Sequence, residues 1–64
     1  MAMFREIAST ALSIEPDHER VWRWMLEEPI AELDGKTVVE LVWEGRGRRV
    51  IDMLDAVKSG LRGL

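Results

Sequence analysis

The stretch ELDGKTVVELVWEGRGRRVIDML, residues 32–54, contains most of the helix start and stop signals in this sequence. Thr37 is followed three residues later by Glu40, the pattern of a capping box in which each side chain binds the backbone N–H of the other residue. The apolar run VVELVW that follows Thr37 would also suit a strand, because it is rich in β-branched residues. Since a cap precedes this run and Gly45 ends it, we predict a short helix over residues 38–44.

Three further helices are predicted around this segment. Apolar residues recur at helical spacing over residues 3–14, until Pro16 interrupts the pattern. Proline suits the first position of a helix, so a second helix is expected over residues 16–27. The segment before the capping box is expected to be a short turn, and a last helix is expected over residues 47–59, ended by Gly60. The predicted fold class is therefore all-α, a small bundle of about four short helices that we expect to form a homodimer.

The composition limits how this chain can be stabilised. Its 64 residues predict a single domain over residues 1–64, with a marginal core. Cysteine is absent and His18 is the single histidine, which excludes disulfides and disfavours a metal cluster. We therefore expect stabilisation by association with another chain, and no cofactor.

The charge balance limits the partners. The net charge is -3 and the pI about 5.0, which disfavours binding to nucleic acid or to an anionic membrane. No apolar run approaches the ~20 residues of a membrane span. Arg5 and Glu6 interrupt the N-terminal segment, which lacks the apolar run of a secretory signal. We expect a cytoplasmic protein.

The second predicted helix has an unusually wide apolar face. Its apolar residues, which include Trp22 and Trp24, spread over roughly 200°, whereas one core-facing stripe needs about 100° or somewhat more. Either both tryptophans fill the core, or the helix has a second surface that is buried by a partner. The residues expected in the core are Val21, Met25, Leu33, Val50, Leu54 and Val57.

Arg46, Arg48 and Arg49 surround the start of the last predicted helix, where cations oppose the helix dipole. Internal ion pairs could compensate, such as Arg48 with Asp52 one helical turn on, or Glu40 or Glu44 facing the arginines. An acidic patch on a partner, or a phosphate, could also compensate. The phosphate interpretation is disfavoured, because the sequence GRG lacks the spacing of a P-loop and no strand precedes it.

Candidate catalytic groups are few. His18 lies in the first turn of the second predicted helix and is expected to be a surface residue. Asp52 and Asp55 are spaced to pair with Arg48 and Lys58 along the last helix. Because a small helical chain also offers little volume for a substrate pocket, we predict that the protein is not an enzyme.

From residue 17 to residue 60 the order of features resembles a known family. The segment DHERVWRWMLEEPIAELDGKTVVELVWEGRGRRVIDMLDAVKSG is similar to the toxin-binding domain shared by the Xre/MbcA/ParS antitoxins. The matching elements are Trp24-Met25 where the family has Trp-Leu, then Leu33, Gly35, residues 37–41, Val50, Leu54 and Gly60. Val38 stands where the family usually has proline. Antitoxins of this family also carry an N-terminal helix-turn-helix, and the single helix expected before residue 17 does not supply one, so DNA binding is not carried over.

The resemblance implies an all-α domain that binds a RES-domain toxin, an NAD-consuming enzyme of bacteria, and occludes its active site. In that family the end of the domain lies near the toxin. The residues expected to face the partner are Trp43, Arg46, Arg48, Arg49, Leu61, Arg62 and Leu64.

Two other functions remain open at this point. The chain could be a small dimeric scaffold or adaptor for a different protein, with Trp22, Trp24 and Trp43 in its interfaces, because tryptophan is enriched at binding hot spots. It could also be a nucleic-acid accessory that uses its arginines, which include Arg46 and Arg62. That function predicts an affinity that falls steeply with salt.

Overall fold

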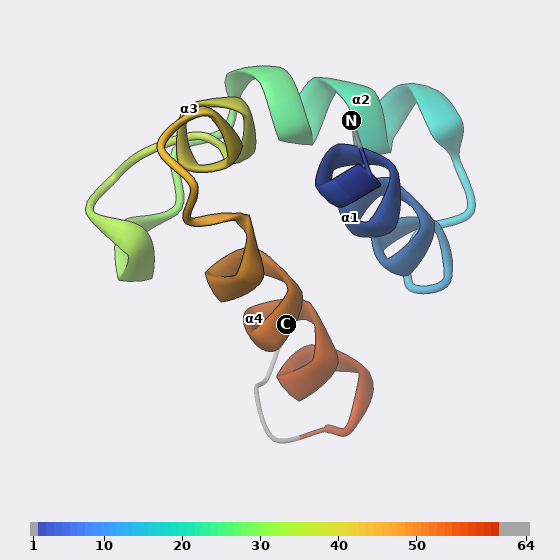
Figure 1. Cartoon of the computed structure of the whole chain (residues 1–64). Helices are drawn as coiled ribbons and strands as arrows, with labels where there is room; N and C mark the ends of the chain where they lie inside the picture. The colour runs from blue at the N-terminus through green and yellow to red at the C-terminus, as the bar shows by residue number, and fades with distance from the viewer. Residues whose placement is uncertain (1, 61–64) are drawn as a thin grey trace.

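The all-α prediction is confirmed by the structure, a computed structural model that describes residues 2–60 (Figure 1). Its helices in chain order are α1 (Ala2–Leu12), α2 (His18–Glu27), the 3₁₀ turn η1 (Ala31–Leu33), α3 (Val38–Trp43) and α4 (Gly47–Lys58). Within this part of the chain, none of the helices has the length and apolar character needed to cross a bilayer.

The helices pack around one central core. α2 runs along one side of the molecule, with α3 beside one of its ends and α1 and α4 beneath it (Figure 1). The most extensive packing joins α1 to α4, and α3 contacts α4, α2 and α1. The buried hydrophobic residues are Ile7, Ala11, Val21, Met25, Ile30, Val38, Leu41, Val50, Ile51 and Leu54. Between residues 2 and 60 no polar or charged side chain is buried, so burial of apolar surface is what holds the helices together.

Most of the predicted core is confirmed, but two positions are not. The predicted core residues Val21 and Met25 on α2 are buried, and so are Val50 and Leu54 on α4. Leu33 is half-buried, because it lies in the short η1 turn where Ile30 takes the inward place. Val57 is also half-buried, in the last turn of α4 and one turn beyond Leu54. Leu33 packs against the edge of the core, whereas Val57 is not among the residues that pack against it.

The boundary between α1 and α2 differs from the prediction. α1 ends at Leu12, and the chain turns before Pro16, whose ring disfavours helical geometry in the preceding residue. α2 begins at His18 instead of Pro16, because Asp17 acts as its N-cap. The Asp17 carboxylate accepts hydrogen bonds from the backbone N–H groups of Glu19 at 3.0 Å and of Arg20 at 3.3 Å.

The predicted start of α3 is confirmed in detail. The backbone N–H of Glu40 donates to the Thr37 hydroxyl at 3.3 Å, and the Thr37 N–H donates to the Glu40 carboxylate at 2.9 Å. This reciprocal pair is the capping box. It selects a helix for a sequence whose β-branched residues would also suit a strand.

The predicted stop at Gly45 is also confirmed. Gly45 has a φ of 77°, which favours glycine, and Glu44 is the C-cap residue, so α3 ends one residue earlier than predicted. The Arg46 N–H donates to the Leu41 carbonyl at 2.7 Å, and the Gly45 N–H donates to the Val42 carbonyl at 3.0 Å. These two bonds form a Schellman motif, which fixes the direction in which the chain leaves α3.

Gly47 lets α4 begin close to its neighbours. It is buried, and a Cβ at this position would lie 2.5 Å from Met3 Cγ and 3.3 Å from Val42 Cγ2. A side chain here would therefore push α4 away from α1 and α3. At the other end, α4 stops at Lys58 with Ser59 as its cap, and Gly60 follows with a φ of 75°, as predicted for a residue that ends a helix.

Candidate protein-binding surface

Among residues 2–60, three large apolar side chains remain exposed. Trp43 on α3 is 85% exposed, and Leu26 and Trp22 on α2 are about half exposed, at 53% and 49%. Trp24 is half-buried and packs against the core. The three tryptophans therefore have different environments, although they are chemically identical.

Trp22 is partly covered within the chain. Its ring stacks on Phe4 of α1, with 5.8 Å between ring centroids and 27° between ring planes. Together with Arg5 and Ala8, the two rings line a shallow hollow between α1 and α2. Part of the wide apolar face predicted for α2 is thus buried against α1, and Trp22 contributes to the packing of these two helices.

Trp43 lines a second hollow, on the outward side of α3. Its lining residues are Val39, Glu40, Trp43 and Glu44. Because side chains four residues apart on a helix are neighbours, Val39 and Trp43 form an apolar row and Glu40 and Glu44 an acidic row beside it. The hollow lies between these two rows.

Glu44 also belongs to a network of ion pairs at the end of α3. Lys36 and Arg46 both bind its carboxylate, the latter at 3.5 Å, and Arg46 binds Asp34 at 2.8 Å. The Ile30 N–H donates to the Lys36 carbonyl at 2.9 Å and closes the turn from which Asp34 and Lys36 extend. The network therefore joins the η1 turn to the junction between α3 and α4.

The ion pairs shift the ionisation of their members. The hydrogen bond from Arg46 lowers the pKa of Asp34, and the hydrogen bond from Lys36 lowers the pKa of Glu44. The hydrogen bond to Asp34 raises the pKa of Arg46. These side chains remain in contact with solvent, so the ion pairs are screened by water and salt.

The arginines predicted to face a partner have unequal environments. The Arg46 side chain is 34% exposed and is engaged by Asp34 and Glu44. Arg48 is exposed and pairs with Asp52 at 3.5 Å, as predicted from their spacing. Arg49 is exposed and forms no ion pair within residues 2–60. Leu61, Arg62 and Leu64, also predicted to face the partner, lie outside the described residues.

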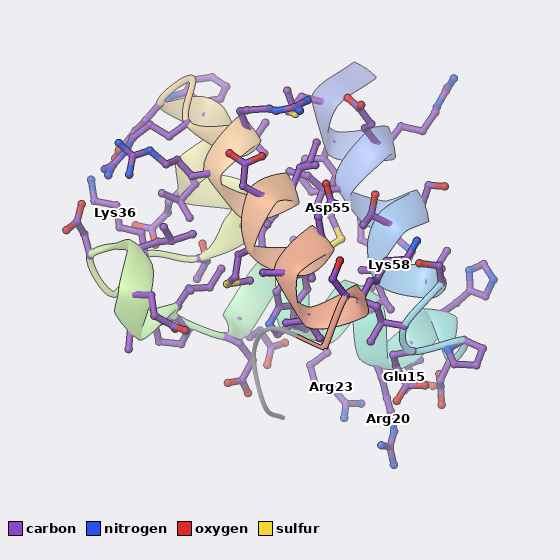
Figure 2. All side chains as sticks on the ribbon, turned by 90° about the horizontal axis from the view of Figure 1, so that it is seen from below. Glu15, Arg20, Arg23, Lys36, Asp55 and Lys58 are labelled. Carbon is purple, nitrogen blue, oxygen red and sulfur yellow. The ribbon has the colours of Figure 1, made fainter. Side chains whose placement is uncertain are left out.

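The other basic residues are dispersed. Lys36 lies at one edge of the molecule, whereas Arg20 and Arg23 lie at another (Figure 2). Arg20 pairs with Glu15 at 3.7 Å, and the nearest partner of Arg23 is an acidic residue one turn earlier on α2. Lys36 therefore lies apart from Arg20 and Arg23, and all three side chains have acidic partners.

The pairing predicted between Asp55 and Lys58 is not formed among the described residues (Figure 2). His18 is exposed, as expected. Among residues 2–60, there is no group of three or more histidine, aspartate or glutamate side chains that could hold a metal ion.

Comparison with models of protein families gave no match, and no curated protein or solved structure matched the chain significantly.

The sequence interpretation missed the surroundings of Trp43. Val39, Glu40 and Glu44 were not among the predicted partner-facing residues, although they line the same hollow. The i, i+4 spacing of Val39 with Trp43, and of Glu40 with Glu44, is the signal that would have shown them. Asp34 was missed because its partner Arg46 is twelve residues away, beyond the reach of a local pattern.

Proposed function

We propose that this chain is a protein-binding module that contacts its partner through the outward side of α3 and the junction between α3 and α4. The observation that carries the proposal is the 85% exposure of Trp43. An exposed tryptophan gains much from burial, and tryptophan is enriched among the residues that dominate binding energy.

The support beneath Trp43 favours this proposal. The capping box at Thr37 holds one end of α3, and the Schellman motif and the Arg46 ion pairs hold the other. A contact residue on a rigid element loses little conformational freedom when it binds, so more of the contact energy contributes to affinity.

For the partner we propose a RES-type NAD-consuming toxin, whose active site the bound module would occlude. This follows from the resemblance of residues 17–60 to the toxin-binding domain of Xre/MbcA/ParS antitoxins. The contact would include Trp43 and the exposed Arg48 and Arg49, and the module itself would act in the cytoplasm without catalysing a reaction.

The test is co-expression of the full chain with a RES-domain enzyme encoded in the same genomic neighbourhood. We expect the pair to co-purify and the chain to protect cellular NAD, measured by an enzymatic cycling assay. Trp43→Ala should weaken binding by about thirtyfold, since removing a hot-spot tryptophan costs about 2 kcal/mol. Glu27→Gln, at an exposed position on α2, is the surface control. Failure to bind or inhibit any such enzyme would contradict the toxin partner.

A homodimeric scaffold is the second candidate, favoured by the exposure of Leu26 and Trp22 on α2. A second copy could cover these side chains and complete the burial of the wide apolar face. Size-exclusion chromatography with light scattering tests this candidate directly. A dimer whose mass falls to that of a monomer in Leu26→Glu would support it, and a monomer at all concentrations would overturn it.

A further inference from the structure

We propose that the hollow beside Trp43 receives an arginine side chain from the partner protein. This inference rests on the proposed function in one respect, namely that the partner is a protein. It adds the chemical character of the contact, which the resemblance to antitoxins does not supply.

The apolar row gives the hollow a surface on which a guanidinium plane can stack. The Trp43 ring is 85% exposed, and Val39 extends the same wall by one helical turn. Tryptophan is the aromatic residue that attracts cations most strongly, and an arginine can lay its methylene stem along an apolar wall while its head meets a charged group. The wall therefore suits a side chain that is apolar along its length and cationic at its tip.

The acidic row supplies the opposite charge. One Glu40 oxygen, Oε1, accepts from the Thr37 N–H at 2.9 Å and from the Thr37 hydroxyl at 3.2 Å. Glu40 Oε2 has no partner within residues 2–60, so it can accept a hydrogen bond from an incoming donor. Both oxygens of Glu44, in contrast, are already bound by Lys36 and Arg46.

The charges around the hollow favour a cation. In the ion network that adjoins the acidic row, Lys36 and Arg46 pair with Glu44 and Asp34, and Arg49 adds a further positive charge near Asp34. The negative charge that lines the hollow without a paired cation is therefore that of Glu40. Of Asp34, Glu40 and Glu44, Glu40 alone forms no ion pair within residues 2–60, although Glu40 or Glu44 was expected to face the arginines. An apolar occupant would strip water from Glu40 without replacing its hydrogen bonds, and an acidic occupant would be repelled. A guanidinium satisfies both the Glu40 carboxylate and the Trp43 ring, because it is planar and offers five donors.

The first test uses the free chain and a small probe, so it needs no knowledge of the partner. N-acetyl-arginine methylamide is titrated into the isotope-labelled protein, and the indole N–H resonances of the three tryptophans are followed by NMR. The neutral isostere N-acetyl-citrulline methylamide serves as the control ligand. We expect the Trp43 resonance to shift with the arginine compound about threefold to fivefold more than with the citrulline compound, while Trp22 and Trp24 respond equally to both. Equal responses at Trp43, or no response, would overturn the proposal.

Glu40→Gln provides the matched variant. Glutamine can keep the capping box, so α3 is retained while the negative charge is removed. In Glu40→Gln, the Trp43 resonance should shift equally with the arginine and citrulline compounds. In Glu27→Gln, it should still shift more with the arginine compound. A preference that persists in Glu40→Gln would contradict a role for the carboxylate.

The same variant separates this inference from the proposed function. If a RES-domain enzyme binds the wild-type chain and binds Glu40→Gln equally tightly, the arginine contact is wrong and the toxin partner stands. If the arginine compound binds selectively but no RES-domain enzyme is captured, the arginine contact stands and the toxin partner is wrong.

Discussion

The two sides of α3 have opposite environments. On the inward side, Val38 and Leu41 are fully buried, whereas Trp43 on the outward side is 85% exposed. The same six-residue helix therefore carries both part of the core and the most exposed large apolar side chain among the described residues. The difference shows that apolar character alone does not say whether a side chain serves the fold or a partner.

The inward side holds the outward side in place. A helix of six residues would not persist alone in water, because helix formation needs many residues to offset its costly first turn. α3 persists because its inward residues pack against other helices and because both of its ends are fixed. Four predictions test this division, from the largest expected effect on stability to the smallest.

Leu41→Ala should have the largest effect. Leu41 is fully buried, so truncation removes apolar contacts and leaves a cavity, at a cost of about 2–5 kcal/mol in the free energy of unfolding. Urea unfolding followed by circular dichroism measures this loss. Leu41→Met, which conserves volume, should cost less than about 1.5 kcal/mol. A loss from Leu41→Ala no greater than that from Leu41→Met would show that the inward side does not hold α3.

Thr37→Ala should have an intermediate effect, because it removes the hydroxyl that caps the N-terminus of α3. The expected loss in the free energy of unfolding is about 1 kcal/mol. Thr37→Ser keeps the hydroxyl and should retain most of the stability. If Thr37→Ala unfolds at the same urea concentration as the wild type, packing alone would suffice to hold this end of the helix.

The ion network should make stability depend on pH. The pKa values of Asp34 and Glu44 are lowered in the folded state, mainly by Arg46 and by Lys36 respectively, so their contribution is fully present above the ordinary carboxyl pKa of about 4. It is lost as the pH falls through the lowered values. Unfolding midpoints measured from about pH 6 to about pH 2 should fall more steeply for the wild type than for Arg46→Gln.

Arg48→Gln is the control for this comparison. Arg48 forms an ion pair with Asp52, and both side chains are exposed and belong to α4. Removing it should leave the wild-type dependence on pH almost unchanged. Identical slopes for the wild type and Arg46→Gln would mean that the network does not stabilise the junction.

Trp43→Ala should have the smallest effect on folding. The side chain is so exposed that the free energy of unfolding should change by no more than about 0.5 kcal/mol. Trp22→Ala removes the ring that stacks on Phe4 and should therefore lower the free energy of unfolding by more than Trp43→Ala does. A large loss in Trp43→Ala, measured by the same urea titration, would show that the ring serves the fold and would weaken its assignment to a partner.

Several features of α3 could be predicted from the sequence because their causes are local. The capping box needs a hydroxyl and a carboxylate three residues apart, and the stop at Gly45 needs a residue that tolerates positive φ. The pairing of Arg48 with Asp52 follows from helical spacing. The pairing predicted for Asp55 and Lys58 was wrong, because an exposed ion pair gains so little free energy that helical spacing alone does not ensure that it forms.

The sequence by itself determined the number and approximate limits of the helices and four of the ten buried apolar residues, because caps, glycines and hydrophobic periodicity act over a few residues. The tertiary structure alone decided the environments of the tryptophans and of Arg46. Trp22 meets Phe4 because α1 packs on α2, and Arg46 meets Asp34 because the η1 turn folds back toward the end of α3. Trp43 stays in solvent because Val38 and Leu41 turn the other side of α3 to the core. These contacts join residues that are distant in the sequence, and they follow from how the helices pack against one another.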